Sequence, residues 1–128
     1  MPVSGIGGLF FRAKDPDALS AWYRDHLGIG AGCVTTEGAT PEEYSWQAEG
    51  GPVVFAPFAA DSDYLAADKQ FMLNLRVRDL DSLLEQLNAA GVNVISKSEW
   101  NDPSTGQFAR IHDPEGNAIE LWEPPTPA

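Results

Sequence analysis

One carboxylate stands out in the sequence because of its neighbours: Glu120 lies between the large aliphatic residues Ile119 and Leu121. Strand interiors disfavour glutamate, and a buried carboxylate needs a cation, a metal ion or hydrogen bonds to stabilise its charge. Two interpretations remain open. Glu120 either lies on the solvated outer face of a strand or belongs to a functional site.

Glu120 belongs to a stretch with the pattern of a β-hairpin, FARIHDPEGNAIELWEP at 108–124. The turn, DPEGN at 113–117, combines a proline that presets φ, a glycine that tolerates positive φ and an aspartate that can accept hydrogen bonds from turn amides. Apolar and polar residues alternate on both sides of the turn. This alternation places Glu120 and Trp122 on one face of the second strand and its large aliphatic residues on the other.

The composition restricts the function classes. The 128 residues suit one domain. No run reaches the roughly 18 apolar residues of a membrane helix, and no signal peptide is visible, so a cytoplasmic protein is expected. The single cysteine, Cys33, rules out an internal disulfide. A net charge of −11 excludes a basic nucleic-acid surface; it either attracts a cationic ligand or keeps the protein soluble.

The first half of the chain recurs in the second half. GLFFRAKDPDALSAWYRDHLG at 8–28 matches MLNLRVRDLDSLLEQLNAAGV at 72–92. Each copy has the pattern of a strand, an aspartate that caps a helix (Asp15 or Asp79), an amphipathic helix and a glycine stop. We therefore predict an internal duplication.

Short segments with strand patterns surround the two helices. They are 5–14, 31–37, 43–49, 52–58, 92–98, 107–113 and 117–123, besides the strand that begins at 72. Together these elements predict an α+β fold of two βαβββ modules, module one over about 5–58 and module two over about 69–124, with a linker over about 59–68. One helix covers one face of each four-stranded sheet, so two modules can enclose a cavity between the open faces.

Three of these segments carry a family resemblance. AKDPDALSAWYRDHLG at 13–28, RDLDSLLEQLNAAGV at 78–92 and DPEGNAIELWEP at 113–124 resemble the vicinal-oxygen-chelate superfamily, which comprises glyoxalase I, bleomycin resistance proteins and extradiol dioxygenases. The resemblance implies paired modules that form a curved, mixed eight-stranded sheet around a cavity, commonly in a homodimer. It also implies a divalent metal in the enzymes of the family, held at four positions.

Only one of those four positions has a metal-binding side chain here. Carried over onto this sequence, they fall on Glu120, Gly8, Met72 and Phe55, or on Ala56 with a one-residue slip. The residues other than Glu120 are not usual ligands of a hard divalent cation. We therefore expect no metal and no other cofactor, with a divalent Zn, Ni, Mn or Fe ion as the alternative.

Alternation along the strands assigns further side chains to the predicted cavity. The predicted lining comprises Phe10, Arg12, Phe55, Met72, Asn74, Arg76, Phe108, Arg110, His112, Glu120 and Trp122, with Tyr44 and Trp46 as further candidates. Arg110 is expected opposite Glu120, so we hypothesise that Arg110, aided by Arg76, neutralises the carboxylate. The pair is either purely structural or a polar anchor for a ligand. Each aromatic residue either packs in the core or lines a pocket for a flat molecule.

These observations favour a metal-independent small-molecule-binding protein that forms a homodimer. One alternative is an enzyme: a metal-dependent lyase, isomerase or dioxygenase resembling lactoylglutathione lyase, or a metal-free enzyme with Glu120 as its catalytic base. The other alternative is a non-catalytic dimeric module that acts through protein partners, for which no positive feature is visible. The sequence does not identify the ligand.

Overall fold

The structure is a computed structural model that describes residues 2–3, 5–29, 46–51 and 53–125. It divides into two compact units, Met1–Trp46 and Gln47–Ala128. The predicted strand 31–37, the start of the predicted strand 43–49, Cys33 and Tyr44 lie outside the described residues.

The helix predicted in the first unit is present. α1, Pro16–Leu27, begins after Asp15, whose carboxylate accepts a hydrogen bond from the Ala18 amide at 3.1 Å. Proline suits the first helical position because it has no amide hydrogen to satisfy there. Gly28 ends the helix in the left-handed conformation, with φ of 68°, which glycine adopts without a steric cost.

The strand predicted over 5–14 is not present in the structure: none of the described residues before α1 lies in a strand. A strand needs a ladder partner, and the three glycines between 5 and 8 weaken strand formation further. The described residues of the predicted strands 43–49 and 52–58 also lie in no strand. Val54 and Phe55 there are 71% and 87% exposed.

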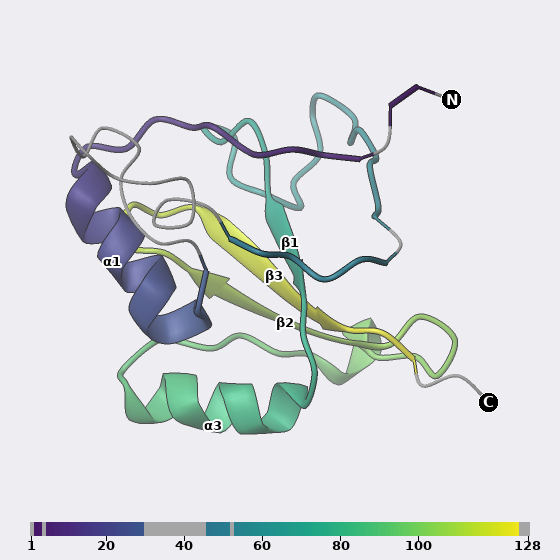
Figure 1. Cartoon of the computed structure of the whole chain (residues 1–128). Coiled ribbons are helices and arrows are strands. Elements are labelled where there is room, and N and C mark those ends of the chain that lie inside the picture. The colour runs from purple at the N-terminus through teal and green to yellow at the C-terminus, as the bar shows by residue number, and fades with distance from the viewer. Residues whose placement is uncertain (1, 4, 30–45, 52, 126–128) are drawn as a thin grey trace. The chain divides into compact units, whose positions relative to one another are not determined.

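A three-stranded sheet forms the centre of the second unit (Figure 1). Its strands are β1, Leu73–Arg76, β2, Gln107–His112, and β3, Ala118–Glu123. β3 is central: it pairs antiparallel with β2 and parallel with β1. The predicted hairpin and the first strand of the second copy are therefore confirmed.

The turn of this hairpin depends on Asp113, which is only 4% exposed. One of its carboxylate oxygens accepts hydrogen bonds from the amides of Glu115 and Asn117, at 2.9 and 3.0 Å, and the other accepts from the Asn117 side chain at 2.8 Å. A tight turn determines the register of the two strands. The turn therefore places Arg110 directly opposite Glu120.

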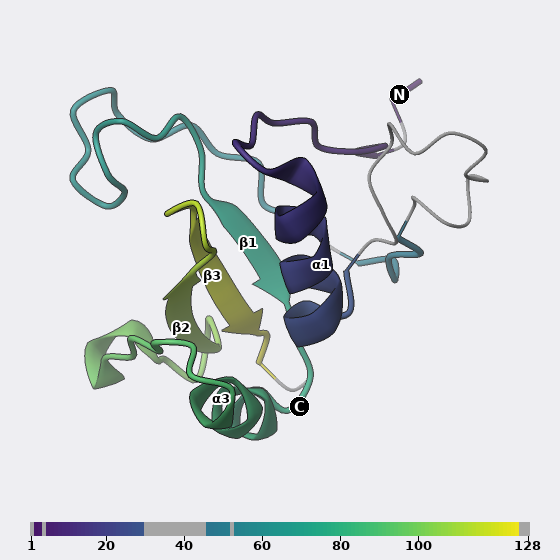
Figure 2. The same cartoon turned by 90° about the vertical axis from the view of Figure 1, so that its left-hand side faces the viewer.

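The second predicted helix is also present. α3, Leu80–Ala89, is capped by Asp79, which accepts a hydrogen bond from the Ser82 amide at 3.3 Å. The carboxylate of Glu123 adds a second cap by accepting from the Leu80 amide at 2.8 Å. α3 lies along one face of the sheet, as the two views agree (Figures 1 and 2). Gly91, with φ of 84°, follows the helix as predicted.

The core of the second unit lies between this sheet and α3. The sheet residues Ala109, Ile111, Ile119 and Leu121 are all 0% exposed, Leu75 is 7% exposed, and Leu80 and Leu87 of α3 are 2% and 1% exposed. These side chains occupy the face that the alternation predicts to be apolar. The opposite face of the same strands carries Glu120.

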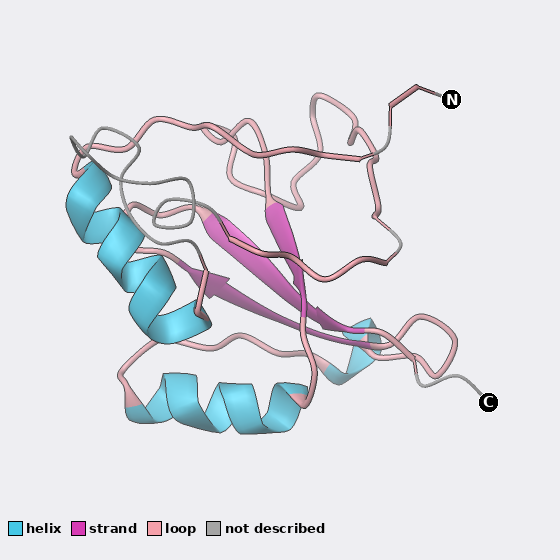
Figure 3. Cartoon of the chain, in the orientation of Figure 1, coloured by secondary structure: helices cyan, strands magenta, loops and turns pink. Residues whose placement is uncertain are grey.

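The segment after α3 differs from its prediction. Of the predicted strand 92–98, only Ile95 pairs with the sheet, exchanging two backbone hydrogen bonds of 2.8 Å with Arg110. A single turn of 3₁₀-helix, η1, Ser98–Trp100, follows at once and ends the pairing. The described residues thus form a mixed α+β structure with a three-stranded sheet (Figure 3). The predicted two modules and eight-stranded sheet are not confirmed by it.

Candidate functional site

The candidate site is built on a row of side chains that crosses the three strands. β1 and β3 run parallel with Asn74 beside Glu120, and β2 and β3 run antiparallel with Arg110 beside Glu120. Residues paired across neighbouring strands project from the same face of a sheet. The row Asn74–Glu120–Arg110 therefore lies on the face opposite the apolar core.

Both oxygens of the Glu120 carboxylate accept hydrogen bonds from uncharged donors. The side-chain amide of Asn74 donates to Oε1 at 2.7 Å, and the hydroxyl of Tyr64 donates to Oε2 at 2.6 Å. Tyr64 comes from the predicted linker 59–68, which lies near the start of β1, on the side of the second unit away from α3 (Figures 1 and 2). Glu120 is half-buried, so these two bonds replace part of the hydration that the carboxylate loses.

Arg110 does not pair directly with Glu120, which corrects the hypothesis of a direct ion pair. Within the described part of the chain no ion pair forms between them, although they are cross-strand neighbours. The guanidinium carbon of Arg110 instead lies 4.4 Å from the ring centroid of Tyr64 and 5.5 Å from that of Trp100. Attraction between the cation and the aromatic rings holds the guanidinium there, while the Tyr64 hydroxyl contacts the carboxylate.

One atom of this arginine has no partner. Nη2 of Arg110 is buried and makes no hydrogen bond. A buried donor without an acceptor is uncommon in native proteins. Arg76, the second arginine of the hypothesis, donates from Nη2 to the backbone oxygen of Glu49 at 2.8 Å.

Aromatic side chains surround the row. The rings of Phe108 and Trp122, opposite each other in β2 and β3, are stacked with centroids 6.3 Å apart and an interplanar angle of 10°. The Trp122 indole N–H donates to the backbone oxygen of Thr105 at 2.8 Å, which fixes the ring. Phe58 meets Tyr64 edge-on at 5.5 Å. Polar and aromatic groups thus lie together on one sheet face.

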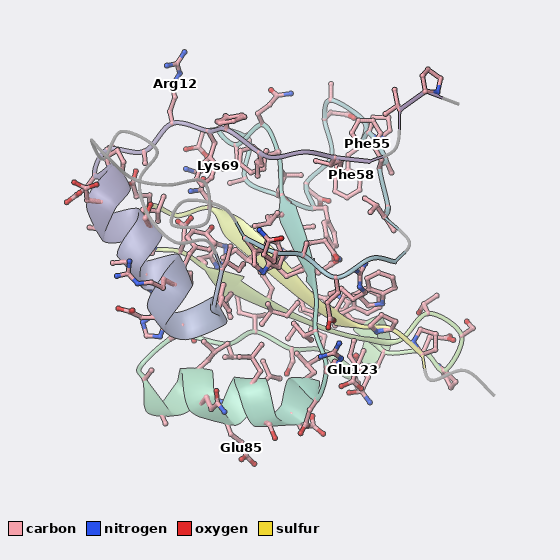
Figure 4. All side chains as sticks on the ribbon, in the orientation of Figure 1. Arg12, Phe55, Phe58, Lys69, Glu85 and Glu123 are labelled. Carbon is pink, nitrogen blue, oxygen red and sulfur yellow. The ribbon has the colours of Figure 1, made fainter. Side chains whose placement is uncertain are left out.

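The structure brings together only part of the predicted lining. The members that share this face are Asn74, Arg76, Phe108, Arg110, Glu120 and Trp122, with His112 at its end. Phe55 is 87% exposed, His112 is exposed at the end of β2, and Met72 is half-buried just before β1. Figure 4 shows the Phe55 and Phe58 side chains projecting from the same segment.

Phe10 and Arg12 belong to the first unit and are exposed, with Phe10 at 86%. Trp46, the last residue of that unit, is 50% exposed. Their membership of a common cavity with the sheet residues therefore stays a prediction.

Sequence reasoning missed two residues of the site, Tyr64 and Trp100. Tyr64 lies in a segment without strand pattern, AADSDYLAAD. The one signal there that the segment packs against something is a pair of large apolar side chains, the aromatic Tyr64 and the aliphatic Leu65. Trp100 is the last residue of η1 and carries no sequence signal that separates it from an ordinary exposed aromatic residue.

Burial raises the pKa of the Tyr64 phenol, and the hydrogen bond to Glu120 and the negative charge of that carboxylate raise it further, against a smaller opposing effect of Arg110. We expect Tyr64 to ionise above pH 10.0, its ordinary value. Its contribution to stability is then complete below pH 10 and is lost as the pH rises through the higher pKa of the folded state. The ionisation of Tyr64 is measured by following the absorbance at 295 nm as the pH is raised. The curve of the Tyr64→Phe variant is subtracted from that of the wild type, and the difference reports Tyr64 alone.

The Glu120→Gln variant is the control for this titration. Removal of the negative charge should lower the Tyr64 midpoint, because the hydrogen bond to Glu120 and the charge of that carboxylate both raise the Tyr64 pKa. A difference titration with its midpoint at or below 10 in the wild type would contradict the assignment of Tyr64 to this buried contact.

The residues at the four implied metal positions do not fit a metal ion. Glu120 is the one carboxylate among them, and both of its oxygens already accept short hydrogen bonds. Among the described residues, no group of three or more His, Cys, Asp or Glu side chains is placed to hold a metal ion.

Within the same residues, no helix has the length and apolar character needed to cross a membrane.

A comparison with protein families identifies a match to most of the chain. The model of the Glyoxalase/Bleomycin resistance protein/Dioxygenase superfamily matches residues 5–121, which confirms the resemblance found in the sequence. A comparison with curated proteins finds no significant match.

Three solved structures are similar to the chain. TnmS3, an antibiotic binding protein from Streptomyces sp. CB03234, is 35% identical over 41% of this chain and 40% of its own, with a TM-score of 0.36. A glyoxalase/bleomycin resistance protein from the same organism is 33% identical over 40% of this chain and 42% of its own, with a TM-score of 0.35. The match thus spans less than half the length of either protein. Lactoylglutathione lyase from Agrobacterium tumefaciens is 20% identical over 96% of both chains, with a TM-score of 0.55, which indicates a shared fold.

Proposed function

Because the chain belongs to the Glyoxalase/Bleomycin resistance protein/Dioxygenase superfamily, we propose that it is a metal-independent small-molecule-binding protein. Its ligand is held against the aromatic and polar face of the sheet formed by β1, β3 and β2. The observation that carries this proposal is the state of Glu120, whose two oxygens both accept hydrogen bonds from uncharged side chains.

The hydrogen bonds to Glu120 conflict with metal binding. A carboxylate that ligates a metal presents an oxygen lone pair to the cation, whereas here Tyr64 and Asn74 direct hydrogens at both oxygens. A metal at this position would compete with these bonds, and the other three implied positions supply no replacement ligand. The donors around Glu120 therefore favour a site in which hydrogen bonds replace the metal.

The aromatic groups beside Glu120 support binding of a small organic molecule. Ligand sites in proteins are mostly apolar, with a few polar groups that orient the ligand. Phe108 and Trp122 supply a stacked aromatic surface next to the polar row. Such a surface suits a flat aromatic or apolar molecule.

We also propose the finer architecture of two βαβββ modules, about 5–58 and 69–124, joined by 59–68, that form an eight-stranded sheet around a cavity in a homodimer. The confirmed β1–α3 and β2–β3 segments of the second module support this arrangement. The fold shared with 96% of the chain of a lactoylglutathione lyase structure supports it as well. The homodimer and the cytoplasmic location stay predictions.

The test of metal independence is the metal content of protein purified without chelator, combined with thermal unfolding in the presence of Zn²⁺, Ni²⁺, Mn²⁺ or Fe²⁺. A ligand that binds the folded state raises the melting temperature by mass action. We expect metal far below one equivalent per chain and no rise in Tm with any of the four ions. Elemental analysis and differential scanning fluorimetry measure these quantities.

Glu120→Gln and Glu85→Gln form the matched pair for this test. Glu85 is exposed on α3, away from the candidate site (Figure 4). One equivalent of metal that is lost in Glu120→Gln and retained in Glu85→Gln would overturn the proposal and would favour a metal-dependent lyase, isomerase or dioxygenase.

A further inference from the structure

We propose that residues 53–58 form a strap that closes over the aromatic and polar face of the sheet when a flat ligand lies there, with Phe55 as the residue that covers the ligand. This inference rests on the proposed function and adds to it the segment that encloses the ligand. It requires a strap with both ends fixed on this face, an apolar middle that is free to move, and a solvent-facing surface for the ligand beneath it.

The first end of the strap is fixed beside β1. The backbone oxygen of Glu49 accepts a hydrogen bond from Arg76 at 2.8 Å, and the Glu49 carboxylate pairs with Arg78. Arg76 projects from the candidate face, opposite Trp122 of β3. Gly51 lies against the same guanidinium, since a Cβ there would be 3.0 Å from the guanidinium carbon of Arg76. The chain therefore enters the strap in close contact with the face that carries the site.

The second end of the strap is fixed by Tyr64. The Tyr64 hydroxyl donates to Glu120 at 2.6 Å, and Phe58 meets the Tyr64 ring edge-on with centroids 5.5 Å apart. The two anchoring residues of the sheet, Glu120 and Arg76, lie on neighbouring strands two positions out of register. The chain between the two ends is therefore much longer than the distance that it spans, so its middle can move while both ends stay in place.

The middle of the strap is apolar and unpacked. Val53, Val54 and Phe55 are 63%, 71% and 87% exposed. Among the described residues, no backbone hydrogen bond links 53–58 to the sheet. A movement of this segment therefore breaks no backbone hydrogen bond, and it is favourable wherever it removes these side chains from water.

The surface that would receive the ligand lies next to the first end of the strap. The stacked rings of Phe108 and Trp122 are half-buried, so part of each faces solvent. Six extended residues span about 20 Å, whereas the outer strands of a three-stranded sheet are about 10 Å apart. The strap is thus long enough to cross the sheet and to cover a molecule that lies on the two rings. Such closure removes the outer side of the ligand from water, as binding sites for small molecules require.

Limited proteolysis with chymotrypsin, which cleaves after aromatic residues, tests the closure. The probe is acridine, a flat aromatic molecule that is uncharged at slightly alkaline pH. We expect the free protein to be cleaved readily at the Phe55–Ala56 and Phe58–Ala59 bonds. Saturating acridine in the presence of EDTA should slow both cleavages about tenfold, because cleavage follows the population of the open form. Mass spectrometry identifies the products, and a small chromogenic substrate controls for inhibition of the protease itself.

Phe55→Ser and Ile6→Ser are the matched variants. Phe55 is 87% exposed in the open form, so its replacement should leave the folded protein intact while removing the side chain that covers the ligand. We expect Phe55→Ser to weaken acridine binding about tenfold, the effect of burying one large apolar side chain. Ile6 is 63% exposed in the first unit, and Ile6→Ser should leave the dissociation constant unchanged. Titration of acridine fluorescence measures both constants.

The outcomes separate this inference from the proposed function. Acridine binding in EDTA without protection of the two bonds, and with an unchanged dissociation constant in Phe55→Ser, would overturn the strap and leave metal-independent binding intact. Resistance of both bonds in the free protein that is lost on dilution would show that a second copy covers the segment, and would overturn the strap. Acridine binding that appears only with added Zn²⁺ and disappears with EDTA would overturn the proposed function itself. Absence of acridine binding up to its solubility limit would overturn the strap as stated.

Discussion

Replacement of Gly106 by alanine is expected to lower the free energy of unfolding by about 3 to 5 kcal/mol. Gly106 has a φ of 112°, a conformation that side chains rarely adopt. A Cβ at this position would overlap the backbone oxygen of Glu123 and lie 2.9 Å from the indole nitrogen of Trp122. The overlapping atom belongs to the backbone of the central strand, so it cannot move aside without disturbing the sheet. Urea denaturation measures the change.

Gly116→Ala and Gly91→Ala are the controls for this prediction. Both glycines have positive φ, at 82° and 84°, but an added Cβ would meet only the end of the Lys69 side chain, 3.9 Å away, at Gly116 and nothing within 4 Å at Gly91. Each control should therefore lose only about 1 kcal/mol, the cost of the backbone conformation. An equal loss in all three variants would show that the close approach of Gly106 to β3 is not present in solution.

Replacement of Glu120 by alanine is expected to lower the free energy of unfolding by about 2 kcal/mol, because it removes two hydrogen bonds. The part-buried donor is left without an acceptor, whereas the exposed donor can bond water. These donors are the Tyr64 hydroxyl and the Asn74 amide. Glu120→Gln should lose less than about 1 kcal/mol, because its amide can accept a hydrogen bond from Asn74 and donate one to the Tyr64 oxygen. Urea denaturation at pH 7 compares the two variants.

The comparison of alanine with glutamine separates two roles of Glu120. If the negative charge of Glu120 neutralises Arg110, glutamine should be nearly as damaging as alanine. If the hydrogen bonds are the stabilising feature, glutamine should retain most of the stability. Equal losses in both variants would contradict the uncharged network that supports metal-independent function.

Sequence patterns predicted the local elements of this protein well where the signals were short-range. Asp15 and Asp79 cap their helices as predicted, and the DPEGN turn places Arg110 opposite Glu120 in the register that alternation requires. Caps and turns depend on residues within a few positions of each other, so a short stretch of sequence is enough to predict them. The family followed from the same motifs.

Other predictions are not confirmed by the described residues, and these concern pairing between distant segments. The strand pattern over 5–14 does not produce a strand, since a strand is stabilised only by a partner that the local sequence does not specify. The pattern over 92–98 yields a single paired residue, Ile95, because the chain turns into η1 directly afterwards. The module boundaries and the shared cavity stay predictions.

The sequence by itself determined that Glu120 lies on the polar face of a strand, beside a guanidinium and away from the apolar core, because alternation and a tight turn leave one arrangement of the hairpin. The tertiary structure alone decided which groups bond that carboxylate. The hydroxyl of Tyr64, fifty-six positions earlier in the chain, donates a hydrogen bond to Oε2 of Glu120. The guanidinium of Arg110, which was expected to pair with this carboxylate, instead lies against the rings of Tyr64 and Trp100. The reason is physical: a half-buried carboxylate bonds whichever donors the packing of the chain brings within reach, and no short-range pattern encodes that packing.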